Sequence, residues 1–167
     1  MGYLANAAIV LATVAAMEGA ACAAHKHIMH RWGWGWHRSH HENRPGRLEK
    51  NDLYAVVFAA PALALVAVDS PERGPLYWTG IGMGLYGFLY ALVHDGIVHR
   101  RWPVRVRVRN RYLRRLVQAH RLHHARSRQD GCVSFGFLYA PPVALLRERL
   151  KAAGGLEGGS SGASPGS

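Results

Sequence analysis

Histidine is the residue type of this 167-residue chain whose number and spacing could support chemistry. Two spacings, H-x4-H and H-x2-H-H, each occur twice and together use His25, His30, His37, His40, His41, His94, His99, His120, His123 and His124. Imidazole binds zinc, copper, iron and nickel, whereas calcium and magnesium prefer oxygen ligands. Ten nitrogens exceed the needs of one ion, and a structural zinc site closes at four ligands. The pattern therefore predicts two metal ions that act on a bound small molecule, and it leaves out His27.

The two spacings have different consequences on a helix. Positions i, i+3 and i+4 share one face of an α-helix, so each H-x2-H-H is expected to direct three imidazoles to one point. Positions i and i+5 lie roughly 140° apart around the axis. An H-x4-H pair therefore needs a helix end or a π-bulge to converge, unless it straddles the site from the side.

Long apolar runs must position these histidines. Residues 3–24 contain one charge, Glu18, and as a helix would extend roughly 33 Å, enough for a hydrocarbon core of about 30 Å. A signal peptide is not favoured for this run because no basic segment precedes it. Residues 53–68 and 76–93 supply two further spans, joined by a turn at 69–75. The sequence thus predicts an all-α integral membrane bundle.

A fourth apolar run, residues 133–146, is short and contains Pro141 and Pro142. Runs of this length are more often re-entrant or interfacial than spanning. A fourth crossing stays open because hydrophobic mismatch is tolerated at modest cost. The expected architecture is three to four transmembrane helices within residues 1–152, followed by a flexible Gly/Ser-rich tail at 153–167.

Positive charge is distributed unevenly along the chain. The net charge is +11, with six Lys and Arg between the first two runs, one in the turn at 69–75 and fourteen after the third run. The positive-inside rule places both basic segments in the cytoplasm, the N-terminus outside, and the histidine motifs at the cytoplasmic face. Orientation and anionic lipid account for the charge, so no nucleic-acid partner is expected.

The third run also contains G-x-G-x-x-G at residues 82–87. This dinucleotide fingerprint has meaning only between a strand and a helix, and here it lies within a span. Gly80 and Gly84 instead form G-x-x-x-G, which predicts close helix packing. No flavin or nicotinamide site is therefore expected in this chain. Any electrons that a reaction at the metal site consumes must come from a partner protein.

Four segments resemble the bacterial β-carotene hydroxylases of the fatty acid hydroxylase and sterol desaturase superfamily, namely residues 25–42, 51–60, 93–103 and 119–142. The resemblance implies an enzyme of the bacterial inner membrane that binds two irons through the ten histidines. It also implies O2 as co-substrate and a ferredoxin-type electron donor. The implied reaction is 3-hydroxylation of carotenoid β-rings, from β-carotene to β-cryptoxanthin and zeaxanthin, with canthaxanthin to astaxanthin as a further expectation. Zinc undergoes no redox change and could only occupy the same ligands in a preparation.

Two kinds of alternative stay open. The nearest is a related membrane di-iron lipid hydroxylase, a desaturase or a carotenoid ketolase. The other is a membrane metal transporter or store, which would distribute histidines and carboxylates through the spans as a pathway. The clustering of the histidines at one face favours the enzyme.

Carboxylates and aromatic residues near the motifs are candidates for supporting roles. A metal-bound imidazole usually donates its other N–H to a carboxylate or carbonyl. The candidate partners are Glu42, Asp52 and Asp95, and the alternative for each is a solvated or capping carboxylate. Glu18 lies within the first span, two turns before His25 on the same face, and is expected to be a hydrogen-bond partner inside the bundle. The candidate substrate-binding residues are Phe135, Phe137 and Tyr139.

Overall fold

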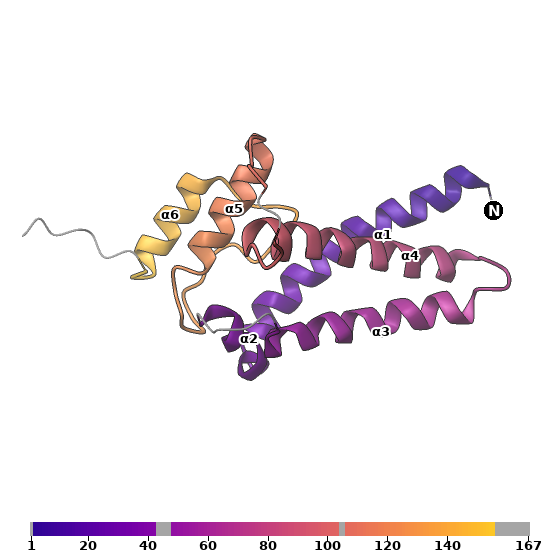
Figure 1. Cartoon of the computed structure of the whole chain (residues 1–167), viewed down its shortest axis with the longest axis horizontal. Helices are drawn as coiled ribbons and strands as arrows, with labels where there is room; N and C mark the ends of the chain where they lie inside the picture. The colour runs from indigo at the N-terminus through magenta and orange to yellow at the C-terminus, as the bar shows by residue number, and fades with distance from the viewer. Residues whose placement is uncertain (1, 43–47, 104–105, 156–167) are drawn as a thin grey trace, which may run out of the picture.

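A computed structural model describes residues 2–42, 48–103 and 106–155, and the regular secondary structure of these residues is entirely helical. Figure 1 shows three long helices extending away from a group of shorter ones. The long helices are α1 (Tyr3–Ala24), α3 (Leu53–Val68) and α4 (Pro75–Tyr90). The shorter helices are α2 (Trp34–His41), α5 (Arg111–His123) and α6 (Val143–Ala152).

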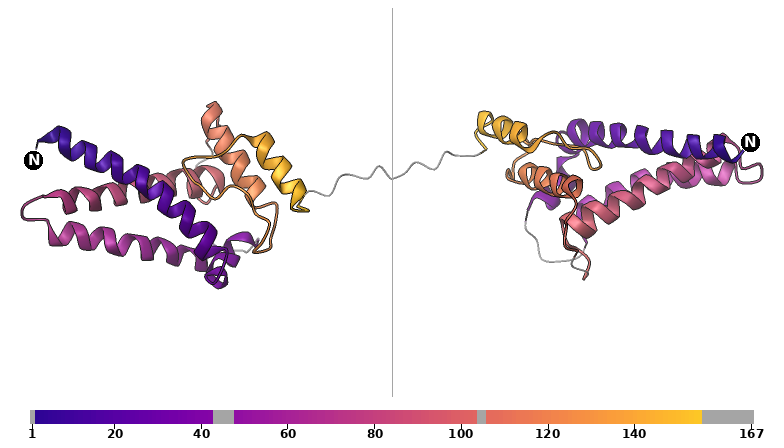
Figure 2. Two further views of the ribbon diagram at one scale, coloured as in Figure 1. Left: turned by 180° about the vertical axis from the view of Figure 1, so that it is seen from behind. Right: turned by 90° about the horizontal axis from the view of Figure 1, so that it is seen from above.

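Three stretches are long and apolar enough to cross a membrane, namely Tyr3–Met29, Lys50–Val68 and Pro75–Val98. The three expected spans are thereby confirmed. Each stretch is longer than its α-helix, because α1 and α4 continue directly into the π-helices η1 (His25–Met29) and η3 (Ala91–Val98), and a 3-10 turn, η2 (Lys50–Asp52), precedes α3. Both views in Figure 2 place α2, α5 and α6 at the end of the spans opposite the α3–α4 turn.

Glycines permit close packing of α4, which lies between α1 and α3 and contacts both. A Cβ atom at Gly80 would lie 2.7 Å from the carbonyl oxygen of Ala62 on α3. A Cβ atom at Gly82 would lie 2.6 Å from Cβ of Thr13 on α1. Gly84 faces open space, so the predicted G-x-x-x-G pair is wrong in its second member. Gly80 and Gly82 provide the close approach instead.

The fourth apolar run does not form a fourth spanning helix. Residues 133–142 have irregular backbone, and the following helix α6 has only 10 residues. Pro141 and Pro142 account for the break, because proline lacks a backbone N–H and disfavours helical geometry in the residue before it. The irregular segment packs against the end of α1 that carries the histidines, with Phe137 next to Ala21.

Helices α5 and α6 cover the histidine-bearing end of the molecule. Asn110 caps α5, and its side-chain oxygen accepts a hydrogen bond from the backbone N–H of Tyr112 at 2.7 Å. One face of α5 packs against the fully buried Leu146 and Leu150 of α6. A neighbouring part of the same helix buries His123. Most of the predicted tail, residues 156–167, lies outside the described residues.

Candidate metal centre

Nine histidines form two groups that could each hold a metal ion. Within each group the ligand nitrogens lie within 4.8 Å of one another. The first group consists of His25, His30, His37, His41 and His123. The second group consists of His40, His94, His99 and His120. All of these side chains are buried except that of His99, which is half-buried. Two adjacent groups match the expectation of two metal sites.

The two π-helices explain how the H-x4-H pairs converge. The backbone N–H of His30 donates to the carbonyl of His25 at 3.0 Å, and that of His99 donates to His94 at 2.9 Å. These are the i to i+5 hydrogen bonds of a π-helix, whose wider turn brings both members of each pair to one side. Of the alternatives that the spacing left open, the π-helical one is present at both pairs. Each pair contributes to a single group.

Each H-x2-H-H motif is divided between the two groups, so the expectation of three imidazoles at one point is wrong. In α2, His37 and His41 belong to the first group, whereas His40 belongs to the second. In α5, His120 belongs to the second group and His123 to the first. The reason is that positions i+3 and i+4 diverge by about 100° around the helix axis. Each helix therefore contributes to both sites.

His124 lies between the two groups. Its ring centroid is 4.4 Å from that of His41, 4.5 Å from His120 and 4.7 Å from His40. Its Nε2 atom is buried and has no hydrogen-bond partner among the described residues. A buried polar atom without a partner is rare, and at this place it fits a tenth metal ligand. His27, which the motifs leave out, is exposed.

Oxygen acceptors determine which nitrogen of each ring carries the proton. Seven Nδ1 atoms lie 2.7–3.0 Å from an oxygen. The acceptor is a backbone carbonyl for four of them: that of Phe135 for His25, Gln129 for His30, Arg126 for His41 and Val133 for His123. The acceptor is a side-chain oxygen for the other three: that of Asn51 for His37, Glu49 for His40 and Asp95 for His94. Because these oxygens accept, each Nδ1–H donates and each Nε2 keeps its lone pair.

The Nε2 atoms face one another across the two groups' centres. The Nε2–Nε2 distance is 3.0 Å between His25 and His37 and also between His40 and His94. With the proton on Nδ1, neither Nε2 of a pair can donate, so the lone pairs repel each other. A divalent cation among them converts this repulsion into coordination. The donor set therefore fits a metal ion in each group.

Burial keeps these imidazoles neutral. It lowers the pKa of His37 and His99 to about 3. It lowers the pKa of His41 to about 4 and that of His124 to about 2. Neighbouring imidazoles add to the effect, because one positive charge disfavours another nearby. Since only the neutral imidazole binds a metal, the ligands are available at neutral pH.

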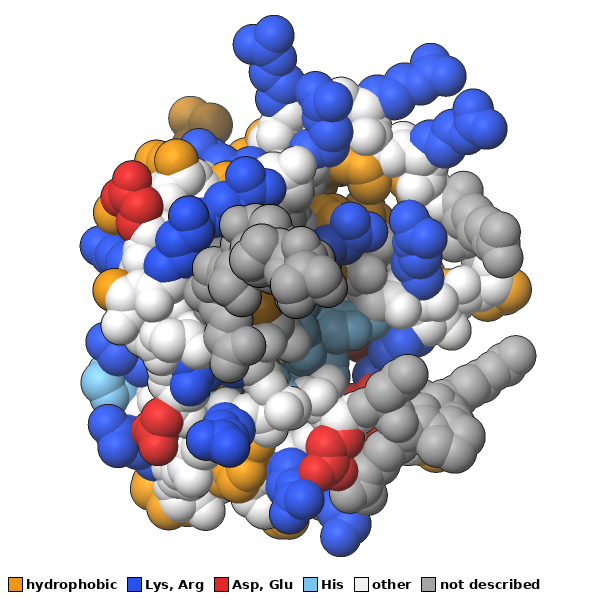
Figure 3. Space-filling view, turned by 90° about the vertical axis from the view of Figure 1, so that its left-hand side faces the viewer, with side chains coloured by type: hydrophobic (Ala, Val, Ile, Leu, Met, Phe, Trp, Pro, Cys, Tyr) orange, Lys and Arg blue, Asp and Glu red, His pale blue; other side chains and the backbone are white. Residues whose placement is uncertain are grey.

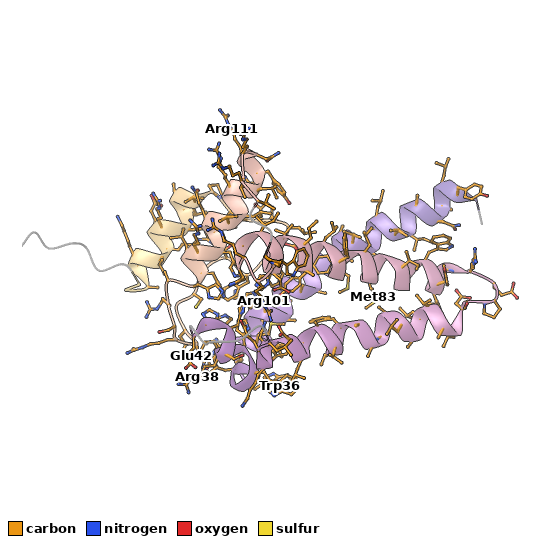
Figure 4. The ribbon with its side chains drawn as sticks, viewed as in Figure 1. Trp36, Arg38, Glu42, Met83, Arg101 and Arg111 are labelled. Atoms are coloured by element: carbon orange, nitrogen blue, oxygen red, sulfur yellow. The ribbon has the colours of Figure 1, made fainter. Side chains whose placement is uncertain are left out.

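A network of charged groups joins the second group to the start of α3. Arg101 donates to both oxygens of Asp52 at 2.7 Å and lies 3.5 Å from Asp95. Asp95 in turn accepts from Nδ1 of His94 at 2.8 Å. Asp52 also accepts from the backbone N–H of Glu49 at 2.9 Å. Figure 4 shows Arg101 where the end of α4 approaches the start of α3.

An apolar cavity of about 390 Å³ lies among α1, α3 and α4 and ends at residues that contact the histidines. Its walls within the spans include Met17, Ala21, Phe58, Ala62, Met83 and Tyr86. Its polar end is formed by Asn51, Asp52 and Asp95. Asn51 and Asp95 are the oxygen partners of His37 and His94. The cavity can therefore hold an apolar molecule with one end next to the metal centre.

Phe137 separates this cavity from the imidazoles. Its ring lines the cavity and stacks on His25, with centroids 5.2 Å apart and planes at 9°. It also lies edge-on to His94 at 5.4 Å. Phe135 lies edge-on against His25 and is not among the cavity walls. Tyr139 is 63% exposed and also lies outside the described walls of the cavity.

Comparison of the chain with known protein families identifies the family to which it belongs. The sequence model described as "Fatty acid hydroxylase" matches residues 10–141. The chain belongs to the fatty acid hydroxylase family. The matched region contains all ten motif histidines and Phe137.

Several relatives of this chain are named β-carotene hydroxylases. The β-carotene hydroxylase of Pantoea ananas is 55% identical, covering 96% of this chain and 92% of that protein. The β-carotene hydroxylase of Paracoccus sp. strain PC1 is 54% identical, covering 89% and 92%. The chloroplastic β-carotene hydroxylase 2 of Capsicum annuum is 36% identical, covering 90% of this chain and 47% of that protein. No solved structure matches the chain.

Sequence reasoning missed two side chains that contact the histidines, Glu49 and Asn51. Both belong to the polar stretch immediately before α3. The position of these polar residues at the end of an apolar span was the sequence feature that could have indicated them. Glu42, a predicted partner, forms an ion pair with Arg38, and Figure 4 shows the two side by side at α2. Glu18 accepts hydrogen bonds from the hydroxyl of Tyr86 and from backbone N–H groups, as expected of a hydrogen-bond partner inside the bundle.

Proposed function

We propose that this protein is a carotenoid β-ring 3-hydroxylase. It would convert β-carotene to β-cryptoxanthin and then zeaxanthin, and canthaxanthin to astaxanthin by the same reaction. The names of the bacterial and plant relatives support this substrate class. The observation that carries the proposal is the apolar cavity between spanning helices, whose polar end is formed by hydrogen-bond partners of His37 and His94.

The ten histidines are proposed to bind two irons. With His124 joining the second group, each ion would have five imidazoles, and imidazole is a ligand that suits iron. Bound iron supplies the activation of O2. The overall reaction consumes one O2, two electrons and two protons per hydroxyl group formed and releases one water. Zinc can fill the same ligands in a preparation but lacks the redox change.

The residues of the chain then have three tasks. The carbonyls of Phe135, Gln129 and other acceptors hold each Nδ1–H, so that the Nε2 lone pairs point inward. The apolar walls of the cavity exclude water from the ring. Phe137 provides a flat surface against which one face of the β-ring can lie, beside His25 and His94. An elongated hydrocarbon would enter laterally from the bilayer between the spans.

We also propose that the histidines face the cytoplasm from the bacterial inner membrane, with the N-terminus outside. The distribution of Lys and Arg supports this orientation, because the α3–α4 turn contains only Arg73. Helices α2, α5 and α6 lie at the opposite end of the spans (Figure 1), and α2 and α5 carry five of the motif histidines, His37, His40, His41, His120 and His123.

An acidic ferredoxin-type protein is the proposed electron donor. Figure 3 shows Lys and Arg side chains spread over the end of the molecule, with histidine side chains visible in a hollow between them. The exposed arginines of α5 include Arg111, Arg114 and Arg121. Positive charge around the centre would steer an acidic partner toward it.

The test is pigment analysis in cells that accumulate β-carotene and supply a ferredoxin. Cells expressing the wild-type chain should contain zeaxanthin, and cells expressing His120→Ala should contain only β-carotene. The exposed His27 provides the matched control, because His27→Ala should still yield zeaxanthin. Unchanged β-carotene with membrane-inserted wild-type protein would contradict the proposal.

The same chromatograms separate the alternatives. A ketolase would accumulate keto-carotenoids, and a desaturase or another lipid hydroxylase would leave β-carotene unchanged while altering other lipids. A metal transporter or store would change cellular metal content without new pigment. Among the described residues both histidine groups lie at one end of the spans, which does not provide the pathway that a transporter needs.

A further inference from the structure

Glu18 places a carboxylate inside the first span, where it contacts backbone far away in the sequence. Its Oε1 atom accepts hydrogen bonds from the backbone N–H groups of Phe137, Leu138 and Tyr139 at 2.9, 3.0 and 2.9 Å. Its Oε2 atom accepts from the hydroxyl of Tyr86 at 2.8 Å. One side chain of α1 thus holds three successive amides of the irregular segment.

The chemistry of this contact is that of an anion in a nest of amides. Irregular backbone beside apolar helices leaves N–H groups without partners, and such groups are costly to bury. A carboxylate satisfies three of them with charge-assisted hydrogen bonds. A Cβ atom at Gly136 would lie 2.7 Å from Oε1 of Glu18 and 2.6 Å from the carbonyl oxygen of Tyr139. Glycine at position 136 therefore allows the carboxylate to approach.

Among the described hydrogen bonds, those that join the segment that Glu18 holds to imidazoles go to the first histidine group. The segment's carbonyls at Val133 and Phe135 accept from Nδ1 of His123 and His25, which both belong to the first group. The ring of Phe137 stacks on the same His25. In the second group, the known Nδ1 acceptors of His40 and His94 are Glu49 and Asp95, which lie elsewhere in the chain.

We propose that Glu18 is a positioning residue for the metal of the first group. By holding residues 137–139, it keeps the carbonyls at 133 and 135 in place and so fixes the orientation of two imidazoles. Loss of a hydrogen-bond partner of a ligating imidazole typically weakens metal binding 10- to 100-fold, and displacement of the carbonyls at 133 and 135 would remove two such partners. The expected effect is therefore 10- to 100-fold weaker binding of one metal, with the other metal unaffected. This inference rests on the proposed function, because it requires that each chain binds two metal ions.

The experiment uses the purified full chain in lipid nanodiscs, stripped with a chelator and titrated with cobalt(II), whose visible absorption reports each binding step. Wild type should bind two ions. Glu18→Ala should bind one ion with wild-type affinity and the other 10- to 100-fold more weakly. Glu18→Gln retains an acceptor without the charge, so its loss should be smaller. Gly136→Ala should reproduce the selective loss by displacing the carboxylate.

A matched control and a second measurement complete the test. Gly19 is adjacent to Glu18 and a Cβ atom there meets nothing within 4 Å, so Gly19→Ala should bind two ions like wild type. Hydrogen exchange of the metal-free protein should show faster exchange of the amides at 137–139 in Glu18→Ala than in wild type.

The outcomes separate this inference from the proposed function. If Glu18→Ala binds both ions as wild type does, or weakens both equally, Glu18 does not position the first group. If the wild-type chain itself binds fewer than two ions, the two-metal proposal fails. Accelerated exchange at 137–139 together with selective loss of one ion supports the assignment.

Discussion

The Nε2 atoms of His25 and His37 lie 3.0 Å apart with no proton to share between them. Each ring donates its Nδ1–H elsewhere, His25 to the carbonyl of Phe135 and His37 to the side-chain oxygen of Asn51. Two lone pairs therefore face each other in a buried site. The folded chain is arranged for a cation at this position.

Removal of metal should consequently lower thermal stability. An ion present at 100 times its dissociation constant stabilises the folded state by about 2.7 kcal/mol per site. Circular dichroism of the detergent-purified protein should show a lower unfolding midpoint after chelation, restored by anaerobic addition of ferrous iron. Identical midpoints before and after chelation would count against metal binding in the folded state.

Acid should destabilise the metal-free protein. Burial lowers the pKa of His41 to about 4 and that of His37 to about 3, below the ordinary value of about 6.5 that histidine has in an unfolded chain. Between these values the unfolded state binds more protons than the folded state, so stability is complete above about pH 6.5 and declines as the pH falls. Unfolding midpoints of the metal-free protein should decrease from pH 7.5 to pH 5. The exposed His27 supplies the control, since His27→Gln should follow the wild-type profile.

The division of the H-x2-H-H motifs can be tested with paired substitutions. His40 and His94 belong to one group, whereas His37 belongs to the other. A chain with both His40→Ala and His94→Ala should therefore retain one metal ion. A chain with both His37→Ala and His94→Ala should have weakened binding in both groups. Metal analysis of the two double variants, each with two histidines removed, would reveal equal contents if all imidazoles served one shared site.

Filling the cavity should reduce hydroxylation without removing metal. Met83 is one of the cavity walls, and Figure 4 shows it on α4 where that helix faces α3. Met83→Trp should occupy space needed by the substrate and lower zeaxanthin formation about tenfold, equivalent to about 1.4 kcal/mol. Met83→Leu nearly conserves volume and should remain active. Equal product from both variants, at equal protein level, would argue that the substrate binds elsewhere.

Close packing of α3 and α4 should depend on Gly80. A Cβ atom at this position would lie 2.7 Å from the carbonyl of Ala62, so Gly80→Ala should cost about 1–3 kcal/mol through overpacking. Gly84→Ala meets open space and should have little effect on stability. Thermal unfolding of the two variants provides the comparison. A Gly80→Ala protein as stable as Gly84→Ala would show that the helices can separate without cost.

Local sequence patterns were sufficient for the spans and for the set of histidines. Residues 3–24 could be recognised by apolar length, and the i, i+5 spacing of His25 and His30 already indicated a helix end or a π-bulge, unless the pair straddled the site. The assignment of histidines to groups could not be predicted, because His40 and His41 diverge around the helix toward sites built by other elements. The Nδ1 acceptors could not be predicted either, since His25 and Phe135 are 110 positions apart in the sequence and meet only in the folded chain.

The acceptors of the first group have a consequence for the order of biosynthesis. His25, His30 and His41 leave the ribosome early, but their Nδ1 partners are the carbonyls of residues 135, 129 and 126. The ligands that are synthesised first are therefore oriented last, after translation has passed the third span. The full set of these acceptors therefore exists only once residue 135 has been synthesised, and a truncated nascent chain that ends before residue 126 presents these histidines without the partners that fix their tautomers.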